Sequence, residues 1–167
     1  TNGQEPDMIQ KLQDEDALPT QLYLSTNAAD YESFMKINKP KYDDSWERWN
    51  KTLDMLKDLN TRTVLRITLI RDYNDQKESI PDFAEMFRKA SPHFIEIKSY
   101  MHIGRSTNRL EHENMLEMDE VKNFSEEIAK QSKIFSIMDE SIISRISILQ
   151  NNERFIDRFI STYANTI

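Results

Sequence analysis

The stretch that decides the fold is Phe94-Ile95-Glu96-Ile97-Lys98. Side chains alternate across a β-strand, so Ile95 and Ile97 point to one side while Glu96 and Lys98 point to the other. A strand with one apolar and one charged face has a hydrophobic core on one side only. We therefore predict that this strand packs its apolar face against helices and turns its charged face toward a wet space.

A second stretch repeats the pattern over residues 63–70, which read Thr-Val-Leu-Arg-Ile-Thr-Leu-Ile. Arg66 and Thr68 share one face, and the apolar residues next to them lie on the other. A helical pattern follows each stretch, which is typical of a parallel α/β sheet. Charged side chains on such a sheet are costly unless they are paired or face a wet cavity, and parallel barrels bind ligands at the C-terminal ends of their strands. The sequence therefore predicts one wall of a small-molecule site.

The length of 167 residues allows one domain with a substantial core. A closed eight-unit barrel needs ~250 residues, so only part of one fits here. We expect a single structural unit over residues 1–167. The sequence shows neither an apolar leader nor an apolar run of ~18 residues, so we expect a cytoplasmic protein without a membrane partner.

Composition excludes several classes of site. The chain contains no cysteine, so it cannot by itself form disulfides, thiolate metal sites or iron–sulfur ligation, and we expect no metal site in it. It contains only two glycines, which excludes the glycine-rich phosphate loops of nucleotide-binding motifs. A net charge of −7 argues against a general nucleic-acid binder, although local basic clusters remain compatible with it.

Periodicity predicts about four strands with flanking helices. Besides the two strands above, we expect a helix over residues 4–12, a strand over 21–25, a helix opened by an Asp44–Glu47 capping box, a helix opened by Pro81, a helix around 121–128, a last strand over 142–149 and a closing helix around 155–160.

The charged faces supply the first candidate site residues. Glu96 and Lys98 stand two apart on one strand face, close enough for a semi-buried ion pair. Such a pair is either a structural salt bridge or part of a ligand site. Because Arg66 and Thr68 repeat the arrangement on the preceding strand, we favour a ligand site. Arg66 is the first candidate, since a guanidinium can bind a carboxylate at two points.

Polar residues near the ends of these strands are weaker candidates. Ser25 and Asn27 follow the first strand, where they either bind the hydroxyls or amine of a ligand or simply cap a turn. Asn2 is open to the same two interpretations. His102 follows the strand that carries Glu96, and it is either a structural histidine or a neighbour of the same site.

A locally basic loop follows the Glu96 strand. Arg105 and Arg109 lie in it, and they either contact nucleic-acid phosphates or are simply solvated. No Ser-His-Asp or Cys-His arrangement is found. From the residues alone, an unrelated small-molecule enzyme that uses Glu96 and Lys98 as an acid–base pair therefore stays open, as does a non-catalytic scaffold.

Several longer stretches resemble one family, the radical S-adenosylmethionine enzymes of wybutosine synthesis (4-demethylwybutosine synthase). The resemblance covers nearly the whole chain, and residues 98–104 are its most specific part. The stretches that carry it are Thr1-Asn2-Gly3, residues 18–25, Ser45-Trp46-Glu47-Arg48, residues 62–69, residues 94–104, Arg109-Leu110, Asn114-Met115, Asp139-Glu140-Ser141 and Ser144-Arg145.

The resemblance implies an incomplete (β/α) barrel of the radical S-adenosylmethionine type, of which this chain is the C-terminal half. It implies an enzyme, a lyase that condenses N1-methylguanosine of tRNA-Phe with pyruvate. S-adenosylmethionine and [4Fe-4S] clusters are the implied cofactors. The cluster cysteines and a pyruvate-binding lysine belong to an N-terminal half that is missing here, so this chain alone is expected to be inactive. The alternative is a non-catalytic half-barrel that pairs with a separate cluster-bearing chain.

The resemblance also implies roles for individual residues. Asn2, Ser25 and Asn27 are expected to face the ribose or amino-acid end of S-adenosylmethionine, Arg66 and Thr68 its carboxylate, and Met101 its adenine. Glu96, Lys98 and His102 are expected near the substrate, and Arg105 and Arg109 on the tRNA.

Overall fold

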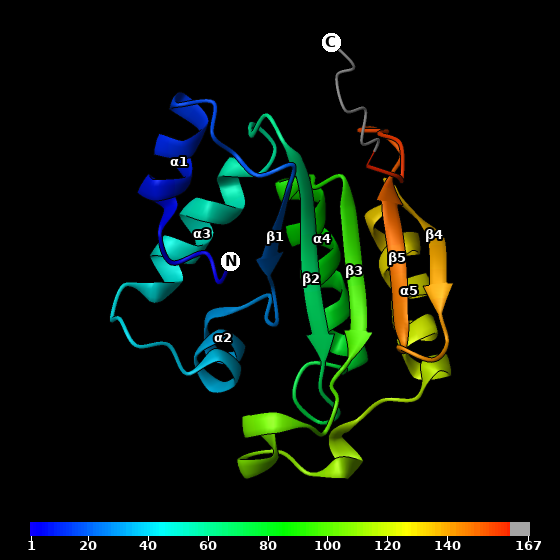
Figure 1. Cartoon of the computed structure of the whole chain (residues 1–167). Coiled ribbons are helices and arrows are strands. Elements are labelled where there is room, and N and C mark those ends of the chain that lie inside the picture. The colour runs from blue at the N-terminus through cyan, green and yellow to red at the C-terminus, as the bar shows by residue number, and fades with distance from the viewer. Residues whose placement is uncertain (161–167) are drawn as a thin grey trace.

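The computed structural model describes residues 1–160, and its central element is one mixed sheet of five strands (Figure 1). The strands lie side by side in the order β1-β2-β3-β5-β4. Strands β1, β2 and β3 are parallel, whereas β5 runs antiparallel to both β3 and β4. The strands are β1 (Gln21–Ser25), β2 (Arg62–Leu69), β3 (Phe94–Ser99), β4 (Phe135–Ser141) and β5 (Ile146–Asn151).

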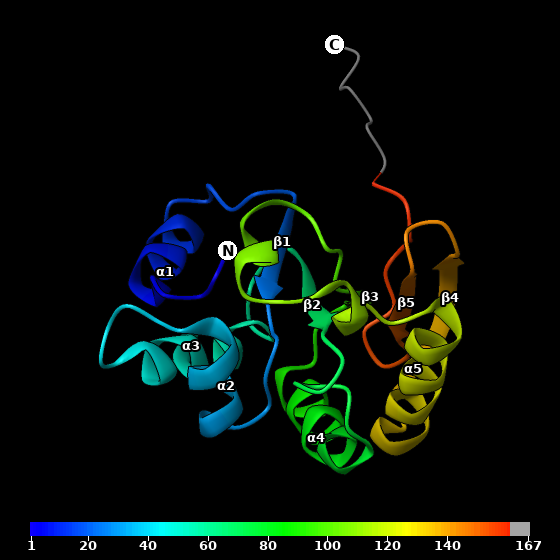
Figure 2. The same ribbon diagram turned by 90° about the horizontal axis from the view of Figure 1, so that it is seen from below.

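The helices are gathered on one side of the sheet. Helices α4 and α5 lie behind it in Figure 1, and α1, α2 and α3 lie beside β1. Figure 2, seen from below, shows that no long helix stands in front of β2 and β3. The helices are α1 (Pro6–Asp14), α2 (Tyr31–Asn38), α3 (Ser45–Met55), α4 (Ile80–Ala90) and α5 (Met118–Ser132), with short 3₁₀ turns at Lys77–Ser79, Gly104–Asn108 and His112–Asn114. None of the described helices is both long and apolar enough to cross a bilayer.

The two faces of the sheet differ as the alternation predicts. Leu65, Ile67, Ile95 and Ile97 are fully buried in the main hydrophobic cluster. That cluster also takes in residues of α4 and α5, among them Phe87. Burial of large apolar side chains, each worth about 1.5–3 kcal/mol, holds these helices on the sheet. We call this side the covered face and the opposite side, which carries the charged residues, the open face.

The expected all-parallel sheet is wrong beyond β3. The predicted last strand over 142–149 is instead a hairpin, because β4 ends at Ser141 and β5 begins at Ile146. Ile142 and Ile143 lie in its turn and are 75% and 96% exposed. The sheet thus has five strands rather than about four. Apolar residues in the turn extended the alternating pattern beyond the strand, which is why the boundary was misplaced.

Two helix predictions also need correction. Asp44 precedes α3, but its side chain makes no cap hydrogen bond, because it accepts one from Nε of Arg48 at 2.8 Å instead. Helix α2 was not predicted at all. It is short, and it begins after Asp30, whose carboxylate accepts from the backbone N–H of Ser33 at 2.9 Å.

The closing helix expected around 155–160 is not formed. Residues 152–160 instead run as a non-helical strap across the start of β2. Arg62, the first residue of β2, donates through its guanidinium to the carbonyls of Asp157, Arg158 and Phe159. The backbone carbonyls of a helix would be used within the helix, so these contacts depend on the irregular path of the strap.

The free edge of β1 pairs with the first residue of the chain. The amino group of Thr1 donates to the carbonyl of Tyr23 at 2.8 Å, and the carbonyl of Thr1 accepts from the N–H of Ser25 at 3.1 Å. These bonds form the slanted pattern of a parallel ladder. Gly3 follows with φ +74°, and an added Cβ would lie 2.7 Å from Leu24, so only glycine fits this close approach.

Candidate functional site

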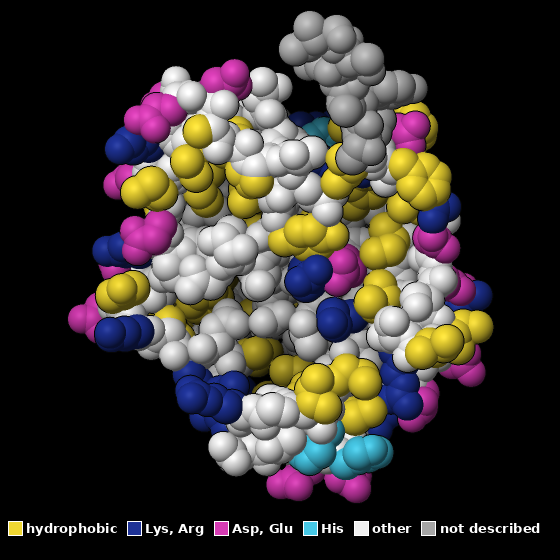
Figure 3. Space-filling model, in the orientation of Figure 1, with side chains coloured by type: hydrophobic (Ala, Val, Ile, Leu, Met, Phe, Trp, Pro, Cys, Tyr) yellow, Lys and Arg dark blue, Asp and Glu magenta, His cyan; other side chains and the backbone are white. Residues whose placement is uncertain are grey.

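A charged pair lies at the centre of the open face, where basic and acidic side chains meet over β2 and β3 (Figure 3). Arg66 and Glu96 are direct partners in the register of these strands. Arg66 donates from Nε to one carboxylate oxygen of Glu96 at 2.7 Å and from Nη2 to the other at 3.3 Å. Its guanidinium also lies 4.3 Å from the ring centroid of Tyr23. A two-point contact fixes orientation as well as charge, so Arg66 is held in place by its neighbours.

The predicted ion pair between Glu96 and Lys98 is therefore wrong. Residues two apart on a strand are ~6.6 Å apart, whereas directly opposed residues of neighbouring strands are ~4.8 Å apart. Arg66 is consequently the nearer partner of Glu96. The ammonium group of Lys98 forms no ion pair with any carboxylate of residues 1–160.

The pairing also changes what Arg66 can offer a ligand. Glu96 takes up the side of the guanidinium that carries Nε and Nη2, and the side chain of Glu96 is only 10% exposed. The side chain of Arg66 is 41% exposed, and Nη1 makes no hydrogen bond within residues 1–160. Only the Nη1 end of the Arg66 guanidinium, called its outer end below, therefore remains available for the carboxylate of a ligand.

The strand register gathers the other open-face candidates next to this pair. Ser25 lies opposite Arg66 in the β1–β2 ladder, and Thr68 lies opposite Lys98 in the β2–β3 ladder. These polar residues stand near the C-terminal ends of parallel strands, where the sequence predicted a ligand site. Their binding roles stay predictions.

A hollow of about 370 Å³ lies at the end of β1 and brings together Asn2, Ser25 and Asn27. Its size falls within the ~300–1,000 Å³ range of ligand pockets. Two further polar side chains, Gln4 and Ser45, line it, and each has a buried oxygen without a hydrogen-bond partner. The three residues expected at one end of a ligand are thus neighbours in space, although they come from two separate segments.

Asn27 also braces the fold. Its Oδ1 accepts from the backbone N–H of Thr68 at 3.1 Å. The buried amide of Asn74 donates to the carbonyls of Asn27 and Thr68 at 2.9 and 3.0 Å and accepts from the N–H of Ile70 at 2.7 Å. These bonds tie the ends of β1 and β2 together, which is the turn-stabilising role considered for Asn27 from the sequence.

Met101 and His102 follow β3 in an irregular segment. Met101 is 38% exposed. Nδ1 of His102 lies 3.1 Å from the hydroxyl of Tyr100, and the backbone N–H of His102 donates to Sδ of Met115 at 3.3 Å. These local contacts give His102 a packing role, and its predicted contact with a substrate is a separate, untested expectation.

The two arginines of the basic loop lie in different surroundings. Arg105 is exposed in the 3₁₀ turn that begins at Gly104. Arg109 lines a small hollow of about 60 Å³ together with Lys36 and Lys39. These lysines were missed by the sequence reasoning. The signal was present, because residues 36–41 read Lys-Ile-Asn-Lys-Pro-Lys and hold three lysines in six positions.

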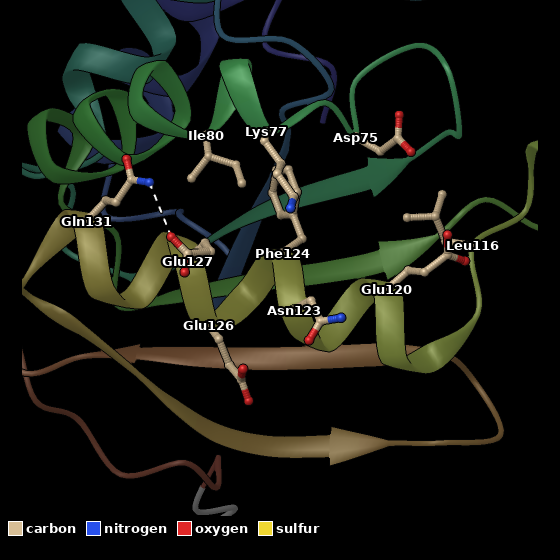
Figure 4. A pocket seen from close by; sticks show the side chains of 10 residues that line it. All are labelled: Asp75, Lys77, Ile80, Leu116, Glu120, Asn123, Phe124, Glu126, Glu127 and Gln131. Carbon is tan, nitrogen blue, oxygen red and sulfur yellow. Dashed lines mark hydrogen bonds between the residues drawn. The ribbon is translucent and has the colours of Figure 1, made fainter.

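A further hollow, of about 620 Å³, lies between the start of α4 and helix α5 (Figure 4). Carboxylates dominate its rim, with Lys77 as the single basic residue. Burial raises the pKa of Asp75, whereas a hydrogen bond from Lys130 lowers the pKa of Glu127. It contains none of the predicted site residues. Within residues 1–160, no group of three or more potential metal ligands is found.

Comparison with protein families gives a match over part of the chain. Residues 89–151 match the family model described as wyosine base formation. That range includes β3 with Glu96 and Lys98, the basic loop and the β4–β5 hairpin.

Curated relatives extend the similarity over most of the chain. The S-adenosyl-L-methionine-dependent tRNA 4-demethylwyosine synthase of Methanocaldococcus jannaschii is 42% identical over 159 residues, which cover 94% of this chain and 47% of the relative. The enzyme of the same name from Pyrococcus abyssi is 38% identical, covering 92% and 44%. That from Oryza sativa is 36% identical, covering 93% and 23%. The chain thus spans about half the length of the archaeal relatives.

Solved structures give the same result for the fold. A structure titled "Structure of TYW1 with a lysine-pyruvate adduct bound" has a TM-score of 0.80 and 40% sequence identity, covering 93% of this chain and 47% of that one. A structure titled "Crystal structure of archaeal TYW1" has a TM-score of 0.73 and 36% identity, covering 93% and 46%. The relatives are named for 4-demethylwyosine, which differs from the product expected from the sequence resemblance, 4-demethylwybutosine.

Proposed function

We propose a function from one premise: the chain belongs to the family of the tRNA 4-demethylwyosine synthases. Within that family, the chain forms the C-terminal half of a radical S-adenosylmethionine lyase that makes 4-demethylwyosine in tRNA. The reaction condenses N1-methylguanosine of tRNA-Phe with pyruvate. The single observation that carries this proposal is the similarity at 38–42% identity to archaeal synthases over more than nine-tenths of the chain.

The sheet supports the proposal that the chain is half of an incomplete (β/α) barrel. Strands β1 to β3 are parallel, their open face carries the polar residues Ser25, Thr68 and Lys98 near the C-terminal ends of the strands, and the free edge of β1 already pairs with Thr1 in the parallel sense. A further parallel strand can therefore extend the sheet at this edge. The open face then becomes the inner wall of the barrel, and the C-terminal ends of its strands hold the ligand.

The residues at these strand ends fit S-adenosylmethionine as a ligand. Asn2, Ser25 and Asn27 supply amide and hydroxyl groups around one hollow, which suits a ribose or an amino-acid group. In this proposal Thr68 and the outer end of Arg66 face the carboxylate, and the partly exposed Met101 packs on adenine. When bound, S-adenosylmethionine would supply the radical chemistry that removes hydrogen from the methyl group of the modified guanosine.

The [4Fe-4S] clusters do not fit this chain. It has no cysteine, and the described residues offer no alternative cluster of ligands. In this proposal the missing N-terminal half holds the clusters and the lysine that engages pyruvate, so the isolated chain is inactive. Glu96, Lys98 and His102 contact the substrate, Arg105 and Arg109 contact the tRNA, and the protein works in the cytoplasm.

A second candidate function is a non-catalytic half-barrel that pairs with a separate cluster-bearing chain. The absence of cysteine and the coverage of about half of the archaeal relatives favour considering it. An acid–base enzyme built on Glu96 and Lys98 is not favoured, because Glu96 is engaged by Arg66.

The test compares this chain with the longer protein that contains it. The gene upstream of Thr1 is read first, and we expect a cysteine triplet in the same reading frame. The full-length protein, given S-adenosylmethionine, a reductant, pyruvate and tRNA carrying N1-methylguanosine, is expected to form 4-demethylwyosine, whereas residues 1–167 alone form none. A stop codon directly upstream of this chain, with activity restored only by a second protein, would instead establish the paired half-barrel.

Calorimetry tests the cofactor site in the full-length protein. We expect S-adenosylmethionine to bind, and Arg66→Ala to weaken binding by about tenfold or more, since a charged hydrogen bond contributes about 1.5–3 kcal/mol. The exposed Lys57→Ala, at the other end of the strands, is the matched control. Equal affinities for both variants would remove Arg66 from the site.

A further inference from the structure

Four basic side chains form a patch at the end of the molecule where β1 to β3 finish. Lys36 belongs to α2, Lys39 ends that helix, Lys41 follows Pro40, and Arg109 comes from the loop after β3. We call these residues the α2 patch. Figure 3 shows basic side chains gathered over α2. Segments more than sixty residues apart in the sequence thus contribute to one basic surface.

Two hollows meet at Lys39. The hollow of about 370 Å³ at the end of β1 has Lys39, Lys41 and Tyr42 on its rim, and the hollow of about 60 Å³ has Lys36, Lys39 and Arg109. Neither hollow is lined by an aspartate or a glutamate. The chain as a whole has a net charge of −7. The eighteen residues that line the two hollows include no carboxylate, so this part of the surface is locally basic.

The cations of the α2 patch also form no ion pair with the described residues. Ten ion pairs occur within residues 1–160, and none of them includes Lys36, Lys39, Lys41 or Arg109. The ammonium group of Lys36 lies 5.0 Å from the ring centroid of Tyr73, which is a cation–π contact. Lysines that bind no carboxylate of their own remain available to an external anion.

The α2 patch is continuous with the candidate site. Asn27 lines the larger hollow, and its Nδ2 donates to Oδ1 of Asn38, the last residue of α2, at 3.4 Å. Asn2 and Ser25 line the same hollow. A polyanion bound along the patch would therefore lie next to the polar ends of β1 and β2.

We propose that the α2 patch binds the phosphodiester backbone of the RNA substrate and that Lys39 and Lys41 hold the phosphate nearest the site. This inference rests on the proposed function. It adds three lysines to the two loop arginines, Arg105 and Arg109, that are proposed to contact the tRNA. RNA fits better than other polyanions because the rim of the larger hollow combines cations with the half-exposed ring of Tyr42. The guanidinium of Arg48 lies 5.1 Å from the centroid of that ring, so a base can stack on its other side.

The experiment removes the three lysine charges in the full-length protein, as Lys36→Gln/Lys39→Gln/Lys41→Gln. Lys133→Gln/Lys57→Gln is the control. Lys133 matches Lys39, because both are exposed residues with a positive φ that end a helix, and both controls lie at the opposite end of the strands. Circular dichroism melts verify that all variants are folded. Binding of unmodified and N1-methylguanosine-containing tRNA is measured over a salt series.

Each lost phosphate contact lowers the slope of log K against log salt concentration by about 0.7–0.9. We expect the triple variant to lose about 2 units of slope and the control less than 0.5. Lys39→Arg, which keeps the charge, should bind like the unchanged protein. Equal slopes for the triple variant and the control would overturn the inference.

Two further measurements separate the possible failures. If the unchanged full-length protein binds no tRNA at all, the proposed function fails and not merely the patch. If the triple variant keeps its tRNA affinity but loses binding to phosphatidylcholine–phosphatidylserine vesicles, the patch serves a lipid surface and the inference is wrong.

Discussion

The covered and open faces of the sheet are built from the same strands but are stabilised in different ways. On the covered face, Ile95 and Ile97 have no exposed surface and pack into one apolar cluster. On the open face, Arg66 and Glu96 satisfy each other, and Lys98 is left without an ion-pair partner among residues 1–160. Stability therefore depends mainly on one face, and the other face can carry chemistry.

The strongest test of this difference between the two faces is to truncate a buried side chain of the covered face. Ile97→Ala removes a fully buried side chain, and we expect it to lower the free energy of unfolding by about 2–5 kcal/mol. The neighbouring Lys98→Ala, on the open face, should change it by less than about 0.5 kcal/mol. Urea denaturation of residues 1–167 measures both. Similar losses in the two variants would mean that the faces are not distinct.

A second change tests the open face itself. Arg66→Met leaves the nearly buried carboxylate of Glu96 without its two charged hydrogen bonds, and we expect a loss of about 1–3 kcal/mol in the free energy of unfolding. Adding Glu96→Gln should recover part of that loss, because no unpaired charge then remains. A double-mutant cycle measures the coupling. Strictly additive losses would show that the pair contributes nothing as a pair.

The smallest expected effect on the free energy of unfolding comes from His93, which precedes β3 and lies on the side of the covered face. Its Nδ1 accepts from the backbone N–H of Thr63 at 3.1 Å. Burial, with smaller contributions from Arg154 and Arg62, lowers the pKa of His93 to about 4 from 6.5. Between these values the unfolded chain binds a proton that the folded chain does not, so the free energy of unfolding falls as the pH drops from 6.5 toward 4.

The measurement is the melting temperature between pH 7 and pH 5. We expect it to fall with pH, and we expect His93→Asn, which cannot take up a proton, to flatten that part of the fall. The variant should be no more stable than the unchanged protein at pH 7. A parallel pH profile for both proteins would place the proton uptake on other groups.

The sequence was sufficient for the three parallel strands and for helices α1, α3, α4 and α5, and insufficient for α2, the β4–β5 hairpin and the strap of residues 152–160. Period-two alternation located β1, β2 and β3, because each strand buries one face in a continuous cluster. The β4–β5 hairpin was misplaced because the exposed Ile142 and Ile143 prolong the same alternation through a turn. Pattern alone does not distinguish a buried isoleucine from an exposed one.

The candidate site was predicted as a set of residues but not as a set of contacts. The faces of Arg66, Thr68, Glu96 and Lys98 follow from alternation within each strand. Which of them pair depends on the register between strands, and register is set by packing across the sheet. The three lysines of residues 36–41 can be seen in the sequence, but only the folded chain brings Arg109 beside them.

The strap fixed by Arg62 has a consequence for the order of folding. Its carbonyl contacts join positions 95–97 residues apart, so they close a very long loop, and loop-closure entropy delays such contacts until the sheet has formed. The ring of Phe94 lies 5.1 Å from the guanidinium of Arg62 and is buried in the folded chain. We expect it to be shielded from water only at this last step of folding. A chain still emerging from the ribosome would present that ring to solvent until the strap of residues 152–160 has been made and has docked on Arg62.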